Sequence, residues 1–168
     1  MLTKTALLLA LCVAVQQFQG LSQFFTGPLV NAILIIAGLA AGLWGGLAIA
    51  VLSPVLAYLI APQPILQNLP QMIIVIMIGN AVMVIAAYVF RNKYLPAGLV
   101  VGSIVKTGFL WLAVSYLVLP LFGQALPEKM KSALTATFSI NQLYTALIGN
   151  VLAYLIWRIV KKAIATKA

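Results

Sequence analysis

Long apolar runs, separated by short polar or glycine-containing stretches, make up most of this chain of 168 residues. A helix that crosses a bilayer needs roughly 20 predominantly apolar residues. Six such segments can be drawn, at about residues 3–18, 28–42, 44–60, 70–90, 96–119 and 138–160. The pattern predicts an all-α polytopic membrane protein, in which residues 1–168 form a single integral membrane domain, a six-transmembrane-helix bundle.

The second and third segments are joined only by the stretch Gly42, Leu43, Trp44, Gly45 and Gly46. Taken together, the two segments exceed the length of one span, and glycines are common in turns. We therefore expect a tight helical hairpin rather than one long helix.

Composition and charge refine this prediction. The chain is 64% hydrophobic and has ten Lys and Arg, one acidic residue and no histidine, which gives a formal net charge of +9. The basic residues flank apolar segments, where they set topology and attract anionic lipid headgroups; a nucleic-acid function is not expected. Most of them fall on one face of a six-span bundle, which predicts two cytoplasmic termini: Lys4, Arg91, Lys93, Arg158, Lys161, Lys162 and Lys167.

Two basic residues do not follow this charge pattern, and the start of the chain needs a separate interpretation. Lys129 and Lys131 fall on the outer side, partly offset by Glu128. The start of the chain resembles a signal peptide, but no small-x-small cleavage site follows cleanly, so we expect the first helix to be retained. Cys12 is the one cysteine, which excludes an internal disulfide.

Polar residues gather on the predicted outer side, whereas the inner hairpin turn has no charged or amide side chain. This asymmetry suggests a place where a small polar solute is captured, although solvation of outer loops explains the loop residues equally well. The outer set comprises Gln16, Gln17, Gln19, Ser22, Gln23, Thr26, Asn31, Gln63, Gln67, Asn68, Gln71, Ser139, Asn141 and Gln142.

Lys106 is the most informative single residue, because it lies about ten positions into the fifth segment and close to mid-membrane. A cation there costs several kcal/mol, so such residues normally face the bundle interior and a partner. No membrane segment supplies a carboxylate. The remaining partners are helix-end carbonyls, amides such as Asn80 or Asn150, water or an anionic ligand; alternatively the side chain snorkels to an interface.

Four asparagines also lie in apolar segments. For Asn80 and Asn150, near mid-depth, hydrogen bonding between helices is the better explanation. For Asn31 and Asn141, and for Gln142 and Tyr144 close by, a ligand role carries comparable weight.

Several functions lack the residues they need. No His, Cys, Asp and Glu cluster suits a metal ion, and no glycine-rich loop with a lysine suits ATP. No membrane carboxylate or histidine relays protons, and no serine has a histidine to activate it. We expect no cofactor and no enzyme activity in this chain, and a dependence on partner proteins.

The residues resemble those of one known family, the S components of energy-coupling factor (ECF) transporters. The resemblance is carried by TALLLALCVA, with Ala6, Ala10 and Ala14 on one helix face; by GPLVNAILIIAGLAAGLWGGLAIAVLSPVLAYL from Gly27 to Leu59; and by FSINQLYTALIGNVLAYLIWRIVKK from Phe138 to Lys162. It extends over essentially the full length and depends on the order of these loose motifs.

The resemblance implies a six-helix bundle in the bacterial cell membrane that captures a vitamin-like solute from outside. It implies that Ala6, Ala10 and Ala14 dock on a membrane T component, which couples to two cytoplasmic ATPases that hydrolyse ATP. It also implies a binding site toward the outer side, onto which we place Asn31, Lys106, Asn141, Gln142 and Tyr144.

The sequence does not determine the identity of the substrate. Metal-transporting members use an N-terminal histidine, which is missing here, and a strongly cationic ligand has no counter-charge. Lys106 suits a carboxylate, a phosphate or another acceptor, which leaves pantothenate, a pyridoxine-like compound, a pyrimidine precursor or something else. Aromatic side chains that can stack on a ring are Phe24, Phe25, Trp111, Tyr116 and Tyr144.

Two other interpretations remain: a membrane scaffold of the rod-shape-determining type, and a small channel or holin whose pore is lined by the segment that contains Lys106. Saturable solute binding would separate the first from a transport subunit, and liposome leakage the second.

Overall fold

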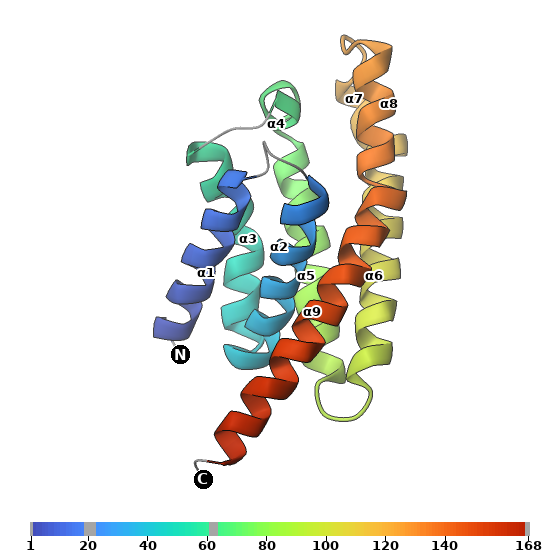
Figure 1. Ribbon diagram of the computed structural model, residues 1–168. Helices are drawn as coiled ribbons and strands as arrows, with labels where there is room; N and C mark the ends of the chain where they lie inside the picture. Colours follow the sequence, from blue (N-terminus) through green and yellow to red (C-terminus); the bar gives the residue numbers. More distant parts are fainter. Residues whose placement is uncertain (1, 19–22, 61–63, 167–168) are drawn as a thin grey trace.

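The computed structural model describes residues 2–18, 23–60 and 64–166, and the regular secondary structure of these residues is helical (Figure 1). The all-α class predicted from the sequence is confirmed for this part of the chain. Gln19, Ser22, Gln63 and Lys167, which the sequence analysis used, lie outside it.

The main helices lie side by side and alternate in direction along one axis (Figure 1). The end at which α1 begins and α9 ends is called the lower end here, and α4, α7 and α8 lie at the upper end. The helices are α1 (Leu2–Gln17), α2 (Gln23–Ala40), α3 (Gly42–Ile60), α4 (Pro64–Asn68), α5 (Met72–Phe90), α6 (Leu95–Leu112), η2 (Ala113–Val118), α7 (Leu119–Phe122), α8 (Glu128–Thr137) and α9 (Ile140–Ala165).

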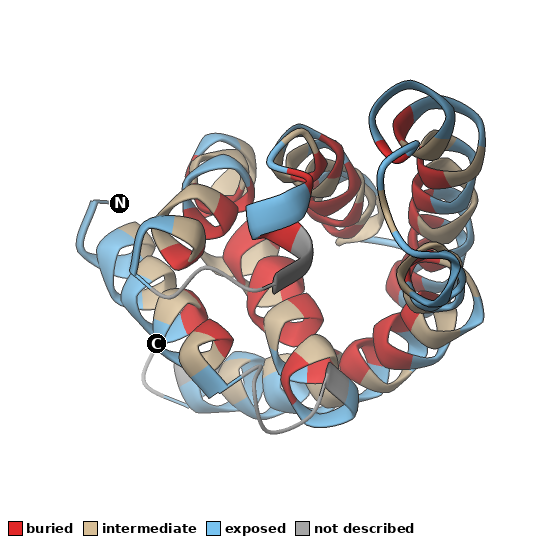
Figure 2. Ribbon diagram, turned by 90° about the horizontal axis from the view of Figure 1, so that it is seen from above, coloured by how far each residue is buried: buried red, intermediate tan, exposed pale blue. Residues whose placement is uncertain are grey.

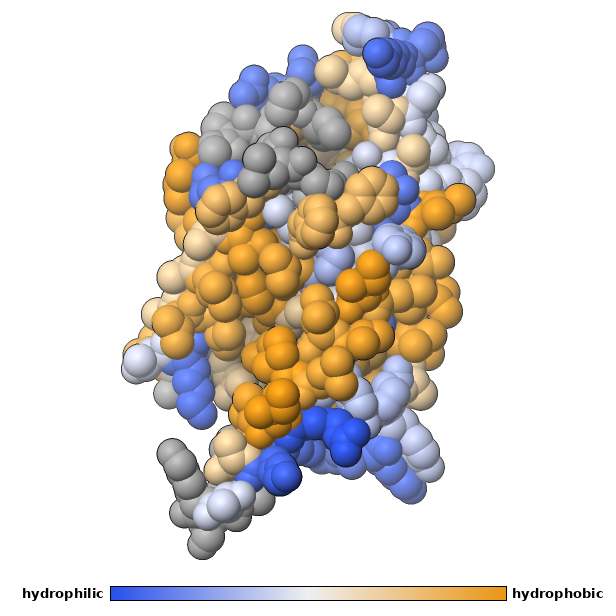
Figure 3. Space-filling model, viewed as in Figure 1, coloured by the Kyte–Doolittle hydropathy of each residue, from blue (hydrophilic) through white to orange (hydrophobic). Residues whose placement is uncertain are grey.

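Among the described residues, four helical stretches are long and apolar enough to cross a bilayer, namely Gly42–Ile60, Met72–Phe90, Leu95–Phe122 and Glu128–Ala163. Leu2–Gln17 and Phe24–Ala40 are apolar but shorter. The 16 residues of α1 rise about 24 Å, somewhat less than the ~30 Å hydrocarbon core. The face shown in Figure 3 is mainly apolar between two more hydrophilic ends, as a bundle embedded in a bilayer requires.

The hairpin of α2 and α3 forms as predicted, but its glycines have different roles. The turn lies at Ala41 and Gly42, and Gly42 has a φ of 78°, which favours glycine. Gly45 and Gly46 lie inside α3 instead of in the turn. A Cβ at Gly46 would lie 2.6 Å from Cγ1 of Val84, so this glycine lets α3 pack closely against α5.

The helix pattern differs from the sequence prediction in several places. The helix expected from residue 28 begins at Gln23, so that Pro28 lies inside α2. The connection expected between residues 119 and 138 contains α7 and α8. Because α8 carries Glu128, Lys129 and Lys131, a search for long apolar runs does not detect it.

The long helix that starts at Leu95 changes geometry above its middle. Residues Ala113–Val118 are π-helical, and the N–H of Leu119 donates to the C=O of Val114, five residues earlier. Pro120 has no N–H with which to bond residue 116 in the α-helical pattern. Val114 and Val118 are buried, so the wider turn presents both side chains to the core.

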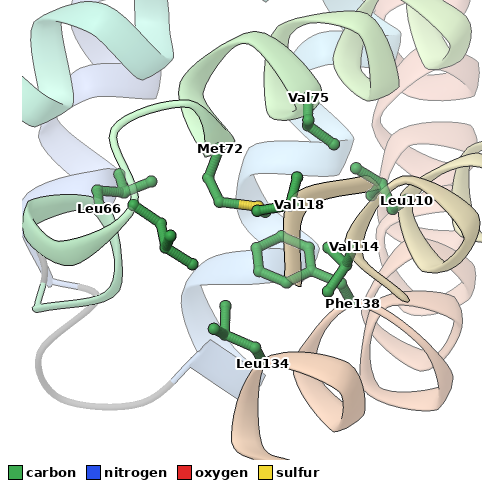
Figure 4. Packing of buried hydrophobic residues seen from close by; sticks show 9 residues of the cluster. Leu66, Met72, Val75, Leu110, Val114, Val118, Leu134 and Phe138 are labelled. Carbon is green, nitrogen blue, oxygen red and sulfur yellow. The ribbon is translucent and has the colours of Figure 1, made fainter. Parts of the chain in front are cut away.

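Buried residues lie on the inward sides of the helices (Figure 2). The apolar ones form three clusters in the described part of the chain. The upper cluster joins α4, α5, α6, η2 and α8, and its buried members are Leu66, Leu69, Met72, Val75, Leu110, Val114, Val118, Leu134 and Phe138. In Figure 4 the ring of Phe138 lies among the labelled apolar side chains. One lower cluster joins α1, α2, α3 and α5 through Cys12, Ile33, Leu34, Ala37, Ile49, Ala50 and Val84. A second lower cluster joins α2, α5, α6 and α9 through Ala32, Ile35, Met83, Ala87, Leu95, Leu99 and Ala153. A polar layer lies between the upper and lower clusters.

Candidate functional site

Lys106 lies at the centre of this polar layer. Its Nζ donates to Oδ1 of Asn31 at 2.7 Å and to Oδ1 of Asn80 at 3.1 Å. All three residues are at most 3% exposed. The bonds join α6 to α2 and α5, and the burial of the ammonium excludes the snorkelling alternative.

Helix register explains why the three side chains meet. On α5, Asn80 lies between Val75 of the upper cluster and Val84 of a lower one. On α6, Lys106 lies between Leu99 of a lower cluster and Leu110 of the upper one. Residues three or four apart share one helix face, so Asn80 and Lys106 point into the bundle as their apolar neighbours do, at a depth between the upper and lower clusters.

Asn31 is held in this layer by a close approach of α2 and α9. A Cβ at Gly149 of α9 would lie 2.7 Å from Cβ of Asn31 and 2.8 Å from the backbone oxygen of Pro28. Only glycine leaves room for α2 at this crossing.

Ser103 and Asn150 form a second polar contact one turn below Lys106. Nδ2 of Asn150 donates to Oγ of Ser103 at 2.9 Å and to the backbone oxygen of Leu99 at 3.0 Å. These bonds join α9 to α6, which confirms the interhelical role predicted for Asn150. Oδ1 of Asn150 is buried and has no hydrogen-bond partner among the described residues.

Helices α1 and α3 also contribute polar groups near this depth. Gln16 lies one turn above Cys12, to whose Sγ its Nε2 donates at 3.3 Å. Ser53 lies one turn above Ile49 and Ala50, is fully buried, and its Oγ lacks a hydrogen-bond partner in the described part of the chain. Cys12, Gln16 and Ser53 therefore extend the polar layer toward α1 and α3.

Asn141 and Tyr144 lie elsewhere, in an open groove of about 770 Å³ between the upper parts of α2 and α9. The groove is mainly apolar, and it is lined by Phe24, Phe25, Pro28, Leu29, Ile140, Asn141, Tyr144, Ile148 and Leu152. Phe24 and Tyr144 contact each other edge to face, with ring centroids 6.4 Å apart. Neither Lys106 nor Asn31 lines this groove, so the predicted site residues fall into two places.

Gln142, Trp111 and Tyr116 belong neither to the polar layer around Lys106 nor to the lining of the groove. Gln142 is 9% exposed, and its backbone oxygen accepts from Oγ1 of Thr145 at 3.0 Å. Trp111 and Tyr116 contact each other edge to face, and both are exposed. The residues predicted to stack on a ligand ring therefore lie largely on the outside of the bundle.

The face of α1 opposite Cys12 is free in the described structure. Ala6, Ala10 and Ala14 are all exposed, whereas Cys12 and Gln16 point into the bundle. The small side chains thus present a flat strip on the outer surface.

Acidic groups are absent from the interior because Glu128 is the one acidic residue of the sequence. Its Oε1 accepts from Nζ of Lys131 at 2.8 Å at the exposed upper end of the molecule. Within the described ranges, no three His, Cys, Asp or Glu side chains come together. The polar layer therefore offers hydrogen-bond donors, amide oxygens and one ammonium.

Sequence reasoning did not assign Ser53, Cys12 and Ser103 to the site, and it treated Asn80 mainly as a helix-bonding residue. The signal that would have found them is depth: each lies near the middle of its own helix, as Lys106 does. Depth alone does not say which helices are neighbours, so the three-residue cluster needs the tertiary structure.

An all-helical bundle with an apolar outer surface and a buried polar layer defines a membrane protein with an interior hydrogen-bonding site. The family model for the substrate-specific component of ECF transporters matches residues 1–164, and the chain belongs to this family. The resemblance seen in the sequence is thereby confirmed. No curated protein and no solved structure gives a significant match.

Proposed function

We propose that this chain is the high-affinity substrate-capture subunit of an ECF-type importer for a vitamin or another micronutrient. The single observation that carries the proposal is the family match over residues 1–164. The buried polar layer around Lys106 supports it, because it gives a small solute hydrogen-bonding partners away from water.

In the proposed arrangement, the bundle crosses the bacterial plasma membrane six times with both termini in the cytoplasm. The lower end carries Lys4, Arg91, Lys93, Arg158 and Lys161, which agrees with the preference of basic residues for the cytoplasmic side. The solute enters from the upper, outer end. The site comprises Asn31, Asn80 and Lys106, whereas Asn141 and Tyr144 line the separate groove between α2 and α9.

Partners complete the transporter. The exposed strip of Ala6, Ala10 and Ala14 docks on the T component, and two cytoplasmic ATPases supply the energy. Small side chains at a spacing of four residues allow two helices to approach closely in lipid. This chain itself carries out no chemical reaction.

The scaffold and channel interpretations lose support from the family match. The family model describes a substrate-specific transport component, which is neither a scaffold nor a pore-forming holin.

Native mass spectrometry of the detergent-purified chain tests the proposal. We expect a small molecule retained from the host at about one per chain, displaced by an excess of the same compound. A chain that retains nothing and binds no compound of a vitamin panel would contradict a capture function.

A further inference from the structure

The ammonium of Lys106 has no counter-charge within the protein. The one carboxylate side chain, that of Glu128, lies at the exposed upper end and pairs with Lys131. An isolated buried charge is costly in a medium of low dielectric, and a partner of opposite charge offsets much of that cost. The amide oxygens of Asn31 and Asn80 supply only dipoles, so the site is electrostatically incomplete.

The hydrogen bonding of the ammonium is incomplete as well. A lysine ammonium has three N–H donors, and the bonds to the two asparagines engage two of them. Counting only the described residues, one donor is left for a further acceptor. The two asparagines, which come from different helices, fix the position of Nζ.

We propose that Lys106 recognises an anionic group of the solute, and that the solute is a monoanion which presents a carboxylate to this ammonium. The inference rests on the proposed function and names the substrate class of the same site. A carboxylate neutralises one ammonium, and a hydrogen bond between charged partners is roughly twice as strong as a neutral one.

A carboxylate fits better than a phosphate monoester. A phosphate monoester carries a charge of about −1.5 to −2 at neutral pH and is commonly bound by several basic groups or a helix N-terminus. Among the described residues, Lys106 is the one basic side chain that is buried. Its single charge matches a single carboxylate.

The experiment supplies the missing counter-charge from the protein itself, by placing a carboxylate beside the ammonium of Lys106. Asn80→Asp places a carboxylate at the position of an amide that already contacts Nζ at 3.1 Å, with little change of shape. It is compared with Lys106→Met, which removes the ammonium. Asn92→Asp, the same substitution at an exposed turn residue between α5 and α6, is the matched control.

The probes are the compound identified by mass spectrometry and three pairs that differ in the carboxylate: pantothenate and panthenol, nicotinate and nicotinamide, orotate and uracil. Affinities are measured by isothermal titration calorimetry in detergent. We expect the wild-type chain to prefer a carboxylate member by about 100-fold, a factor in the range seen when a charged hydrogen-bonding partner is lost.

Both site variants should lower the affinity for the carboxylate by about 100-fold, because neither offers an unpaired ammonium. Asn92→Asp should bind as the wild type does. Asn80→Asp should keep the melting temperature of the wild-type chain or raise it, which separates lost recognition from lost folding.

The other possible results contradict either the carboxylate inference or the capture function. A retained solute that is neutral or cationic, equal affinity for both members of a bound pair, or unchanged affinity in Lys106→Met would overturn the carboxylate inference and leave the capture function intact. A wild-type chain that retains nothing and binds no probe would overturn the capture function itself.

Discussion

At the scale of single residues, the chemistry of the interior depends on one cation and the amides around it. Removing one partner of a buried charged group leaves the other desolvated and unpaired, whereas replacing both partners by apolar groups costs far less. The contacts of Lys106 therefore predict an asymmetry in stability between single and double substitutions.

Asn80→Leu should lower the free energy of unfolding by about 1.5–3 kcal/mol, because Lys106 loses an acceptor for a charged hydrogen bond. The double variant Asn80→Leu with Lys106→Met should recover part of that loss. Reversible unfolding in mixed micelles of dodecyl sulfate measures both values. Asn150→Leu, which removes neutral bonds to Ser103 and Leu99, should cost only about 0.6 kcal/mol. A double variant no more stable than Asn80→Leu alone would show that the ammonium finds another acceptor.

At the scale of elements, the position of the site depends on how closely the helices approach each other. Glycine permits this approach between α2 and α9 at Gly149, and between α3 and α5 at Gly46. The register of α5 and α6 then sets the depth at which Asn80 and Lys106 meet.

Gly149→Ala should destabilise the bundle by about 1–3 kcal/mol, because its Cβ would meet the backbone oxygen of Pro28 at 2.8 Å. It should also weaken solute binding, since Asn31 lies at the same crossing. Gly108→Ala on α6 is the matched control, because nothing lies within 4 Å of its Cβ position. The control should be neutral or stabilising by up to about 1 kcal/mol through helix propensity. Thermal unfolding followed by size-exclusion chromatography reads out both variants, and equal melting temperatures would mean that α9 shifts to accommodate the methyl group.

At the scale of the whole molecule, the polar layer lies inside the bundle, whereas the outer surface is available to lipid or to partner proteins. The proposed docking strip of α1 is exposed along Ala6, Ala10 and Ala14, on the side away from the polar layer. Docking and solute binding should therefore respond separately to mutation.

Ala10→Trp should reduce co-purification with the T component and the ATPases at least about tenfold, because a bulky side chain keeps the helices apart. Solute affinity should not change. Ile104→Trp, at a position of α6 that is 58% exposed, is the control and should leave assembly unaltered. Assembly of Ala10→Trp at the wild-type level would place the docking surface elsewhere.

The sequence by itself determined the helical class, the approximate segments, a hairpin in the stretch from Gly42 to Gly46 and the position of Lys106 near mid-depth. Each depends on local composition: apolar runs long enough for lipid, glycine where φ is positive, and a charge too costly to face hydrocarbon. The helices α4 and α8 and the π-helical segment Ala113–Val118 were not predicted from the sequence. Hydropathy does not reveal short or polar helices outside the long apolar runs, and it does not reveal a local change of helix type.

Only the tertiary structure decided which polar residues share a site. The family resemblance grouped Asn31 and Lys106 with Asn141 and Tyr144 in one site, whereas helix rotation places the last two in the outer groove. Neighbouring residues on one helix point in different directions, about 100° apart, so depth in the membrane does not determine which side chains meet. The partners of Lys106 come from α2 and α5, far apart along the chain, and helix packing alone brings them together.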